Sequence, residues 1–167
     1  IETEARARYP EECCGGLLGR EGDGGERTVV RAVPARNERD DERERRYLLG
    51  PREVLRLEDE AAEDGLELLG FFHSHPDHPA VPSEYDREHA WPWYSYVIVA
   101  VAGGEPEGIR SWQLVDGREG FSEEAMITEE SDPSAPSGQP VVEEPSEDTE
   151  FLASAESIDI VYKPNQE

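Results

Sequence analysis

Two histidines separated by a single residue, His73 and His75, stand at the end of a short apolar stretch. Residues 66–72 are mostly apolar, and their number suits a buried strand better than a helix. If this strand continues through His75, its two-residue period places both imidazoles on the same side. Ser83 is expected to open a helix, and Asp86 falls in its first turn. Two imidazoles and one carboxylate are the three-ligand set of a catalytic zinc site, whose fourth position stays open for water.

Each half of this pattern also has an ordinary structural explanation. A pair of histidines at this spacing on a strand can arise by chance, with one ring satisfied in the core. Ser83 and Asp86 alone match a helix capping box, which needs no metal. The metal interpretation therefore depends on both halves together and on an acidic residue further upstream.

That acidic residue lies between Tyr9 and Gly19, where Glu11 and Glu12 precede two cysteines and two glycines. With this block included, the sequence resembles the JAMM (MPN+) metalloprotease family. The family pattern is a Glu, then His-Ser/Thr-His-Pro, and then Ser-x-x-Asp, seven residues after the second His. Here residues 76–82 form the seven-residue gap, so every signature position matches.

The upstream block is similar to the Pro-x-Glu-x-Cys-Gly sequence of the bacterial and archaeal branch of that family. It matches at Pro10, Glu12, Cys14 and Gly15. The resemblance covers roughly the first two thirds of the chain, which is the size of one ordinary domain.

The resemblance implies a role for each matching residue. His73, His75 and Asp86 would hold Zn2+, although imidazole and carboxylate ligands also accept iron or manganese. Glu12 would be the general base and acid, because the family register selects it over its neighbour Glu11. Ser83 would donate a hydrogen bond to the developing oxyanion.

The resemblance also implies a fold and an activity. The fold is a mixed α/β (α+β) domain of the JAMM and cytidine-deaminase-like type, with a central mixed β-sheet flanked by helices. The activity is that of a zinc-dependent peptidase, which hydrolyses peptide or isopeptide bonds at the C-terminus of ubiquitin-like or sulfur-carrier proteins. The alternatives are a catalytically silent MPN-type interaction scaffold, another His-x-His metal hydrolase such as a phosphoesterase, and a DNA-repair-associated relative of the same fold.

Charge and composition restrict the partners. The 167 residues carry a net charge of −24, and residues 121–167 contain 13 acidic residues and one lysine. This charge would repel nucleic acids and anionic membranes, and no stretch reaches the ~18 apolar residues of a membrane span. The two cysteines, Cys13 and Cys14, are adjacent and unsuited to pair with each other, which favours a reducing, cytoplasmic location. A homodimer is compatible with the sequence, which does not determine the oligomeric state.

The composition divides the chain into a metalloprotease domain at 1–121 and an acidic tail at 122–167. The tail is rich in Glu, Ser and Pro up to residue 150, which is typical of disorder, and residues 157–162 are predicted as a strand or a disordered end. Within the domain we expect helices at 2–8, 51–64 and 83–90, with strands at 14–19, 28–33, 47–49, 66–75, 94–102 and 109–115. Residues 37–46 are a run of charges, interpreted as a solvated loop or as a loop that grips the substrate.

Overall fold

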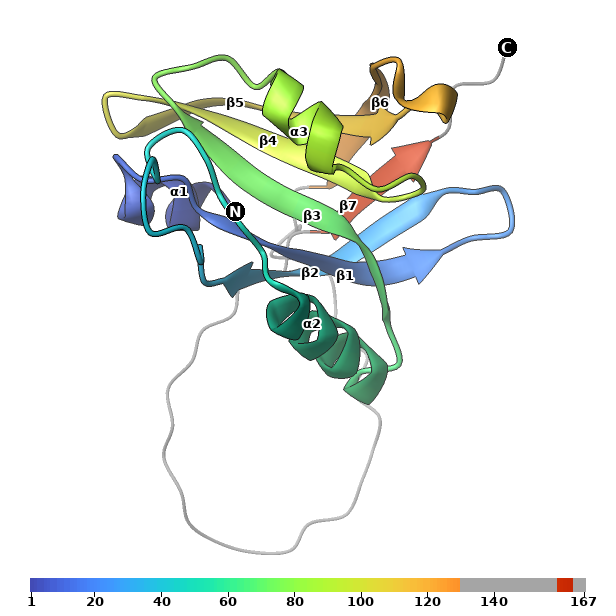
Figure 1. Ribbon diagram of the computed structural model, residues 1–167. Helices are drawn as coiled ribbons and strands as arrows, with labels where there is room; N and C mark the ends of the chain where they lie inside the picture. Colours follow the sequence, from blue (N-terminus) through green and yellow to red (C-terminus); the bar gives the residue numbers. More distant parts are fainter. Residues whose placement is uncertain (130–158, 164–167) are drawn as a thin grey trace, which may run out of the picture.

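The structure is a computed structural model that describes residues 1–129 and 159–163 of the chain (Figure 1). Along the sequence its elements are α1 (Glu2–Arg8), β1 (Cys14–Glu21), β2 (Arg27–Ala35), α2 (Pro51–Glu63), β3 (Glu67–Pro76), α3 (Glu84–His89), β4 (Ser95–Ala102), β5 (Glu105–Leu114), the 3-10 turn η1 (Asp116–Arg118), β6 (Phe121–Glu129) and β7 (Asp159–Lys163). None of the described helices is long and apolar enough to cross a membrane.

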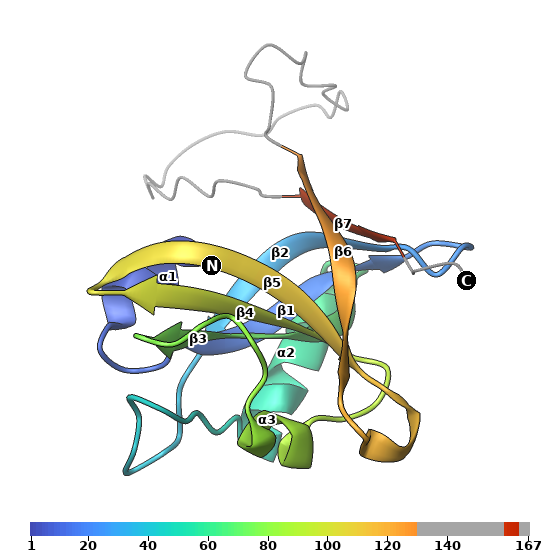
Figure 2. The ribbon, with the colours of Figure 1, turned by 90° about the horizontal axis from the view of Figure 1, so that it is seen from above.

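The strands form one mixed sheet in the order β1-β2-β7-β6-β5-β4-β3, and the sheet closes on itself as a barrel because β1 also pairs with β3 (Figure 2). Among the described strands, β3 and β4 are the one parallel pair, and every other pair is antiparallel. The predicted α+β fold with a central mixed sheet and flanking helices is confirmed. Its closure into a barrel was not predicted.

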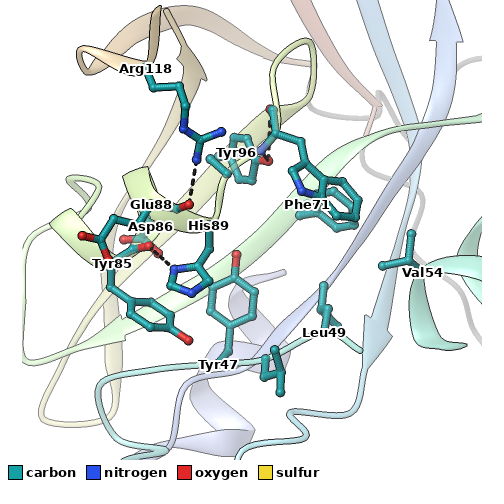
Figure 3. Close-up of a pocket in the computed structure, with 13 residues that line it drawn as sticks. Tyr47, Leu49, Val54, Phe71, Tyr85, Asp86, Glu88, His89, Tyr96 and Arg118 are labelled. Carbon is teal, nitrogen blue, oxygen red and sulfur yellow. Dashed lines mark hydrogen bonds between the residues drawn. The ribbon is translucent and has the colours of Figure 1, made fainter. Parts of the chain in front are cut away.

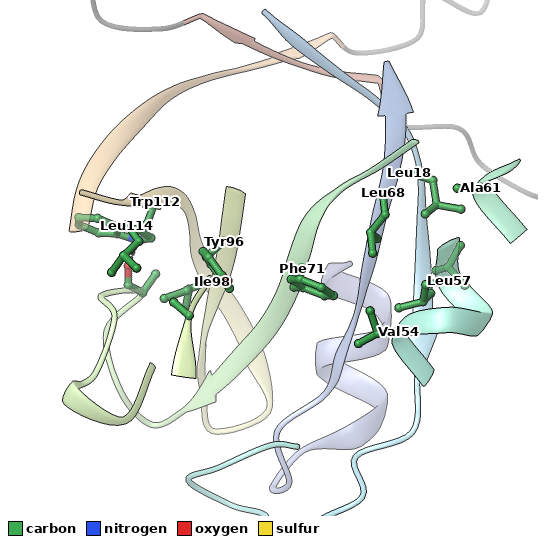
Figure 4. Close-up of a cluster of buried hydrophobic side chains, with 13 residues drawn as sticks. Leu18, Val54, Leu57, Ala61, Leu68, Phe71, Tyr96, Ile98, Trp112 and Leu114 are labelled. Atoms are coloured by element: carbon green, nitrogen blue, oxygen red, sulfur yellow. Dashed lines mark hydrogen bonds between the residues drawn. The ribbon is translucent and has the colours of Figure 1, made fainter. Parts of the chain in front are cut away.

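The sheet is covered on both faces. Helix α2 packs on β1 and β3, where Leu57 joins Phe71, Tyr96 and other buried side chains in one apolar cluster (Figure 4). Helix α1 packs on β4 and β5, where Ala5 belongs to a second cluster with Phe72 and its neighbours. Strand β3 is therefore buried on both sides, which explains why its sequence is almost continuously apolar rather than alternating.

The register of β3 determines which of its side chains face α2 and α3. A register shift opposite Leu17 and Leu18 inserts one extra residue into β3, so that both Leu68 and Phe71 join the α2 cluster. From Phe71 onward the strand alternates regularly, which places His73 and His75 on that same face. Ser74 points to the opposite side and accepts a hydrogen bond from the Cys13 amide at 2.9 Å.

Two parts of the predicted chain organisation need correction. Residues 122–129 are not disordered but belong to β6, where two of the acidic side chains have partners in the sheet. Glu123 pairs with Arg110 at 2.6 Å, and Glu124 accepts hydrogen bonds from Ser95 and Ser111. The predicted boundary at residue 121 thus falls at the start of a strand. Residues 130–150 lie outside the described part of the chain.

The other corrections concern short strands. Residues 47–49 are not a strand, since this stretch pairs with none of the described strands. A C-terminal strand exists two residues later than its predicted start, at Asp159–Lys163. It lies between β2 and β6 and so closes the chain's own sheet.

The close approach of β3 to β4 depends on Gly70. A Cβ at this position would overlap the backbone carbonyl of Ser95, whereas a Cβ at Gly108 of β5 would meet no atom within 4 Å. We expect Gly70→Ala to lower the free energy of unfolding by about 2–4 kcal/mol, because the backbone of β4 must move. Gly108→Ala is the matched control and should change it by less than about 1 kcal/mol. Urea unfolding of both variants measures the difference, and equal stabilities would contradict this account of the β3–β4 contact.

Candidate metal centre

The sheet and α3 bring the three predicted metal ligands together. His73 is completely buried and His75 is 8 % exposed. Their Nε2 atoms lie 3.0 Å apart, and the Asp86 carboxylate oxygens lie 3.4 Å from that of His73 and 3.7 Å from that of His75. A tetrahedral ion with bonds of 2.0–2.1 Å keeps its ligand atoms about 3.3 Å apart. The three side chains therefore fit a metal ion, and no other group of this kind occurs in the described residues.

Hydrogen bonding and burial prepare both imidazoles as ligands. The Nδ1 atom of His75 donates to the carbonyl of Pro79 at 2.8 Å, which leaves the lone pair of Nε2 directed at the cluster. Burial lowers the pKa of His73 to about 4, so this ring is neutral at physiological pH. A neutral imidazole is the form that binds a metal.

Ser83 fixes the Asp86 carboxylate through a capping box. The backbone N–H and the hydroxyl of Ser83 both donate to Asp86 Oδ2 at 2.6 Å, and the Asp86 amide donates back to Ser83 Oγ at 3.2 Å. Burial opposes ionisation of Asp86, but the imidazoles and these hydrogen bonds outweigh it and hold its pKa below the usual range. The capping and metal interpretations of this motif are thus compatible.

Glu11 and Glu12 have different environments. Glu12 precedes β1 and is 6 % exposed, whereas the Glu11 side chain is about half-exposed and pairs with Arg43 at 3.4 Å. Burial raises the pKa of Glu12 to about 8, although His75 and Arg46 oppose the rise. Glu12 lines a cavity of about 680 Å³ together with His75, Ser83 and Asp86. The structure thus brings all five predicted site residues together.

A second cavity, of about 480 Å³, lies beside the first (Figure 3). Its walls include Leu49, Val54, Phe71 and Trp91, and the two cavities share Tyr47, Tyr85 and Asp86. Sequence reasoning missed Tyr47, whose ring stacks on His73 with centroids 4.6 Å apart. It also missed the Pro79 carbonyl, because a backbone acceptor leaves no signal in side-chain types.

The charged run at 37–46 is more firmly attached than a solvated loop. The Glu12 amide donates to the Arg43 carbonyl at 2.7 Å, and the Asn37 side chain binds the backbone of Glu12 and Arg46. The loop therefore forms one wall of the site. His78 and His89, which lie near the motif in sequence, are not part of the ligand cluster.

Comparison with known proteins agrees with this geometry. The model of the family described as prokaryotic homologs of the JAB domain matches residues 1–115. The chain belongs to this family. A desampylase of Pyrococcus furiosus is 30 % identical over 118 residues, which are 71 % of this chain and 76 % of the relative. The family resemblance found in the sequence is thereby confirmed.

Other relatives cover less of their own length. A desampylase of Haloferax volcanii is 40 % identical over 95 residues, or 56 % of this chain and 66 % of the relative. A probable TtuB-protein conjugate cleaving protease of Thermus thermophilus is 36 % identical over 73 residues, or 44 % of this chain and 46 % of the relative. The chain thus spans about two thirds of the Haloferax volcanii protein and about half of the Thermus thermophilus protein.

Two solved structures are similar over most of the chain. A Salinibacter ruber protein is 39 % identical, with a TM-score of 0.59, and the match covers 81 % of this chain and 87 % of the other. A Desulfitobacterium hafniense protein is 35 % identical, with a TM-score of 0.62 and coverages of 72 % and 80 %. These matches support the fold.

The raised pKa of Glu12 predicts a pH-dependent stability. A carboxyl group whose pKa rises from 4.5 to about 8 on folding binds its proton more tightly in the folded state. Its contribution is therefore full below pH 4.5 and is lost as the pH rises to about 8. In metal-free protein we expect Glu12→Gln to be more stable than wild type at pH 8, by about 1–3 kcal/mol, and equally stable near pH 4.

Denaturant unfolding across this pH range, after chelation, measures that difference. Glu11→Gln is the control, because it makes the same substitution one residue away on a side chain that is half-exposed rather than buried. Added zinc should reduce the gain of Glu12→Gln, since a nearby dication stabilises the carboxylate. A stability difference that does not change with pH would contradict the assignment of the raised pKa to Glu12.

Proposed function

We propose that this protein is a zinc-dependent metallopeptidase that hydrolyses peptide or isopeptide bonds at the C-terminus of ubiquitin-like or sulfur-carrier proteins. The observation that carries the proposal is a buried carboxylate, Glu12, in the same cavity as the His73, His75 and Asp86 cluster. The relatives named as desampylases and as a TtuB-conjugate cleaving protease support the class of substrate.

In this proposal His73, His75 and Asp86 hold the metal through two nitrogens and one carboxylate oxygen. This donor set and the spacing of its atoms suit zinc. When bound, zinc supplies a Lewis acid for the scissile carbonyl and lowers the pKa of water in its open position to about 7.

Glu12 then transfers the proton. Its carboxylate accepts a proton from the attacking water and delivers it to the leaving amine. The pKa of Glu12 is about 8 in the metal-free site. The positive charge of a bound metal would lower this pKa, so that the carboxyl group can accept and release a proton near neutral pH. Glu12 is fixed for this task by its own backbone, whose N–H donates to the Arg43 carbonyl.

Ser83 supplies a hydrogen bond to the carbonyl oxygen of the substrate. Its Oγ is held in place because it accepts from the Asp86 amide at 3.2 Å, while its hydrogen points to Asp86 Oδ2. That hydrogen can rotate toward the substrate, since Oδ2 keeps the bond from the Ser83 backbone N–H. One residue thus holds a metal ligand and stabilises developing charge.

The charge of the chain and its cysteines refine the proposal. A net charge of −24 argues against nucleic-acid and anionic-membrane partners. Cys13 and Cys14 are buried free thiols, which agrees with a reducing, cytoplasmic environment.

The test uses an isopeptide-linked TtuB conjugate as the probe, with zinc-loaded protein. We expect wild type to cleave it, and Glu12→Gln to lower kcat by about 10²–10⁴-fold with little change in KM, because proton transfer is lost. Glu11→Gln is the matched control, one residue away on a half-exposed side chain that does not line the cavity, and should retain kcat within about two-fold. Zinc content and unfolding of both variants show that the site is intact.

The results separate the proposal from its alternatives. Cleavage of p-nitrophenyl phosphate, with no cleavage of the conjugate or of a coumarin amide of the TtuB C-terminal peptide, would indicate a phosphoesterase. A folded, zinc-free protein that cleaves neither probe would indicate an interaction scaffold. Equal loss of activity in Glu11→Gln and Glu12→Gln would overturn the assigned role of Glu12.

A further inference from the structure

The proposed reaction needs hydrogen-bond donors at the carbonyl oxygen, and Ser83 alone is a constrained donor. Its hydroxyl already makes a 2.6 Å bond to Asp86, a metal ligand, and this bond must be broken for the hydroxyl to serve the substrate. A second donor with no such commitment would stabilise the developing charge without weakening the hold on Asp86.

Tyr47 is placed to be that donor. Its ring stacks on His73, with centroids 4.6 Å apart and planes inclined by 29°, and it is one of three residues that line both cavities. Figure 3 shows the ring rising from the side of Leu49 toward Asp86 and His89, with its hydroxyl at the far end. Tyr47 therefore lies where the two cavities meet.

The Tyr47 hydroxyl makes no hydrogen bond to any residue within the described ranges. The hydroxyls of Tyr9 and Tyr96, by contrast, have partners at 2.9 Å and 2.6 Å. Tyr47 is half-buried and lines both cavities, so its hydroxyl is open to them rather than sealed in the core. An unpaired hydroxyl beside a metal cluster is thus available to a ligand.

Asn37 fixes Tyr47 from both sides. Its Nδ2 donates to the Arg46 carbonyl at 3.1 Å, and its Oδ1 accepts from the Leu48 amide at 3.2 Å, so it binds both neighbours of Tyr47. The same Nδ2 contacts the Glu12 carbonyl at 3.4 Å. One side-chain amide therefore sets the backbone of Tyr47 and of Glu12 relative to each other.

We propose that Tyr47 is a further catalytic residue, whose hydroxyl donates a hydrogen bond to the carbonyl oxygen of the scissile bond, and that Asn37 positions it together with Glu12. This inference rests on the proposed peptidase function. It assigns stabilisation of the oxyanion to two hydroxyls, Ser83 from α3 and Tyr47 from the opposite loop. It also gives the charged loop at 37–46 a purpose, which is to carry Tyr47 over the metal site.

The test compares Tyr47→Phe with wild type, because phenylalanine keeps the stacking on His73 and removes only the hydroxyl. With the TtuB conjugate as probe, kcat should fall about 10²-fold, the range expected for the loss of one oxyanion donor. KM and zinc content should stay within about two-fold. Tyr94→Phe is the control, since Tyr94 packs on Phe71 and lines neither cavity.

A binding measurement provides a readout without turnover. In a Glu12→Gln background, Tyr47→Phe should change the Kd of the uncleaved conjugate by less than about two-fold, because the bond strengthens only as charge develops. Asn37→Asp keeps the acceptor for Leu48 and loses both donated bonds. It should lower kcat. In the double variant with Tyr47→Phe, the fold-loss of kcat should be smaller than the product of the two single losses, because both act through Tyr47.

The outcomes distinguish the two proposals. An active wild type whose kcat is unchanged in Tyr47→Phe would overturn the role of Tyr47 and leave the peptidase function intact. Equal losses in Tyr47→Phe and Tyr94→Phe, or a loss of zinc in Tyr47→Phe, would also overturn it, since both would indicate a structural role. A zinc-loaded wild type that cleaves neither the conjugate nor the coumarin amide would overturn the function itself, and Tyr47 with it.

Discussion

The Nε2 atoms of His73 and His75 face each other at 3.0 Å, with the Asp86 carboxylate beside them, in a place that excludes most water. Burying two imidazoles and a carboxylate together is costly, because each group loses its hydration and the Nδ1 atom of His73 has no hydrogen-bond partner within the described residues. A metal ion bound here would turn the same three groups into ligands. Much of the structure around them holds this unfavourable arrangement in place.

Strand β3, the Ser83 capping box of α3 and the turn η1 share that task. Strand β3 is held between β1 and β4 and covered on both faces, so the two imidazoles stand on a rigid support. The carboxylate comes from α3, a short helix that contributes no residue to the apolar core clusters. Its position depends on the Ser83 capping box and on bonds between Arg118 of η1 and the α3 backbone. The burial of Glu12 lowers the stability of the fold further, as is common where stability and function compete.

Much of this site could be predicted from the sequence because its signals are local. The two-residue period of a strand places His73 and His75 on one face, and the capping pattern places Asp86 in the first turn of a helix. The fold class followed from the family resemblance. Contacts between distant segments left no comparable signal, so the closure of the sheet by β7 was not predicted. The acidic start of β6 was misjudged for the same reason, because the partners of Glu123 and Glu124 lie on other strands.

The loop at 37–49 shows the limit most clearly. Its charges suggested exposure, yet Asn37 and Arg43 attach its backbone to that of Glu12. Residues 47–49 are predicted as a short strand, whereas the Tyr47 ring stacks on His73. Side-chain types alone do not reveal a contact that depends on where a loop crosses a sheet. The apparently solvated segment is therefore the one that completes the site.

The measurement that tests the central claim most directly is the metal content of purified protein after loosely bound ions are removed. Elemental analysis should find about one zinc per chain in wild type. Zinc should be lost in Asp86→Ala but retained in Glu84→Ala, which removes an exposed carboxylate from the same helix. Folded wild-type protein without metal, or equal zinc in Asp86→Ala and wild type, would contradict the assignment of His73, His75 and Asp86 as a metal centre.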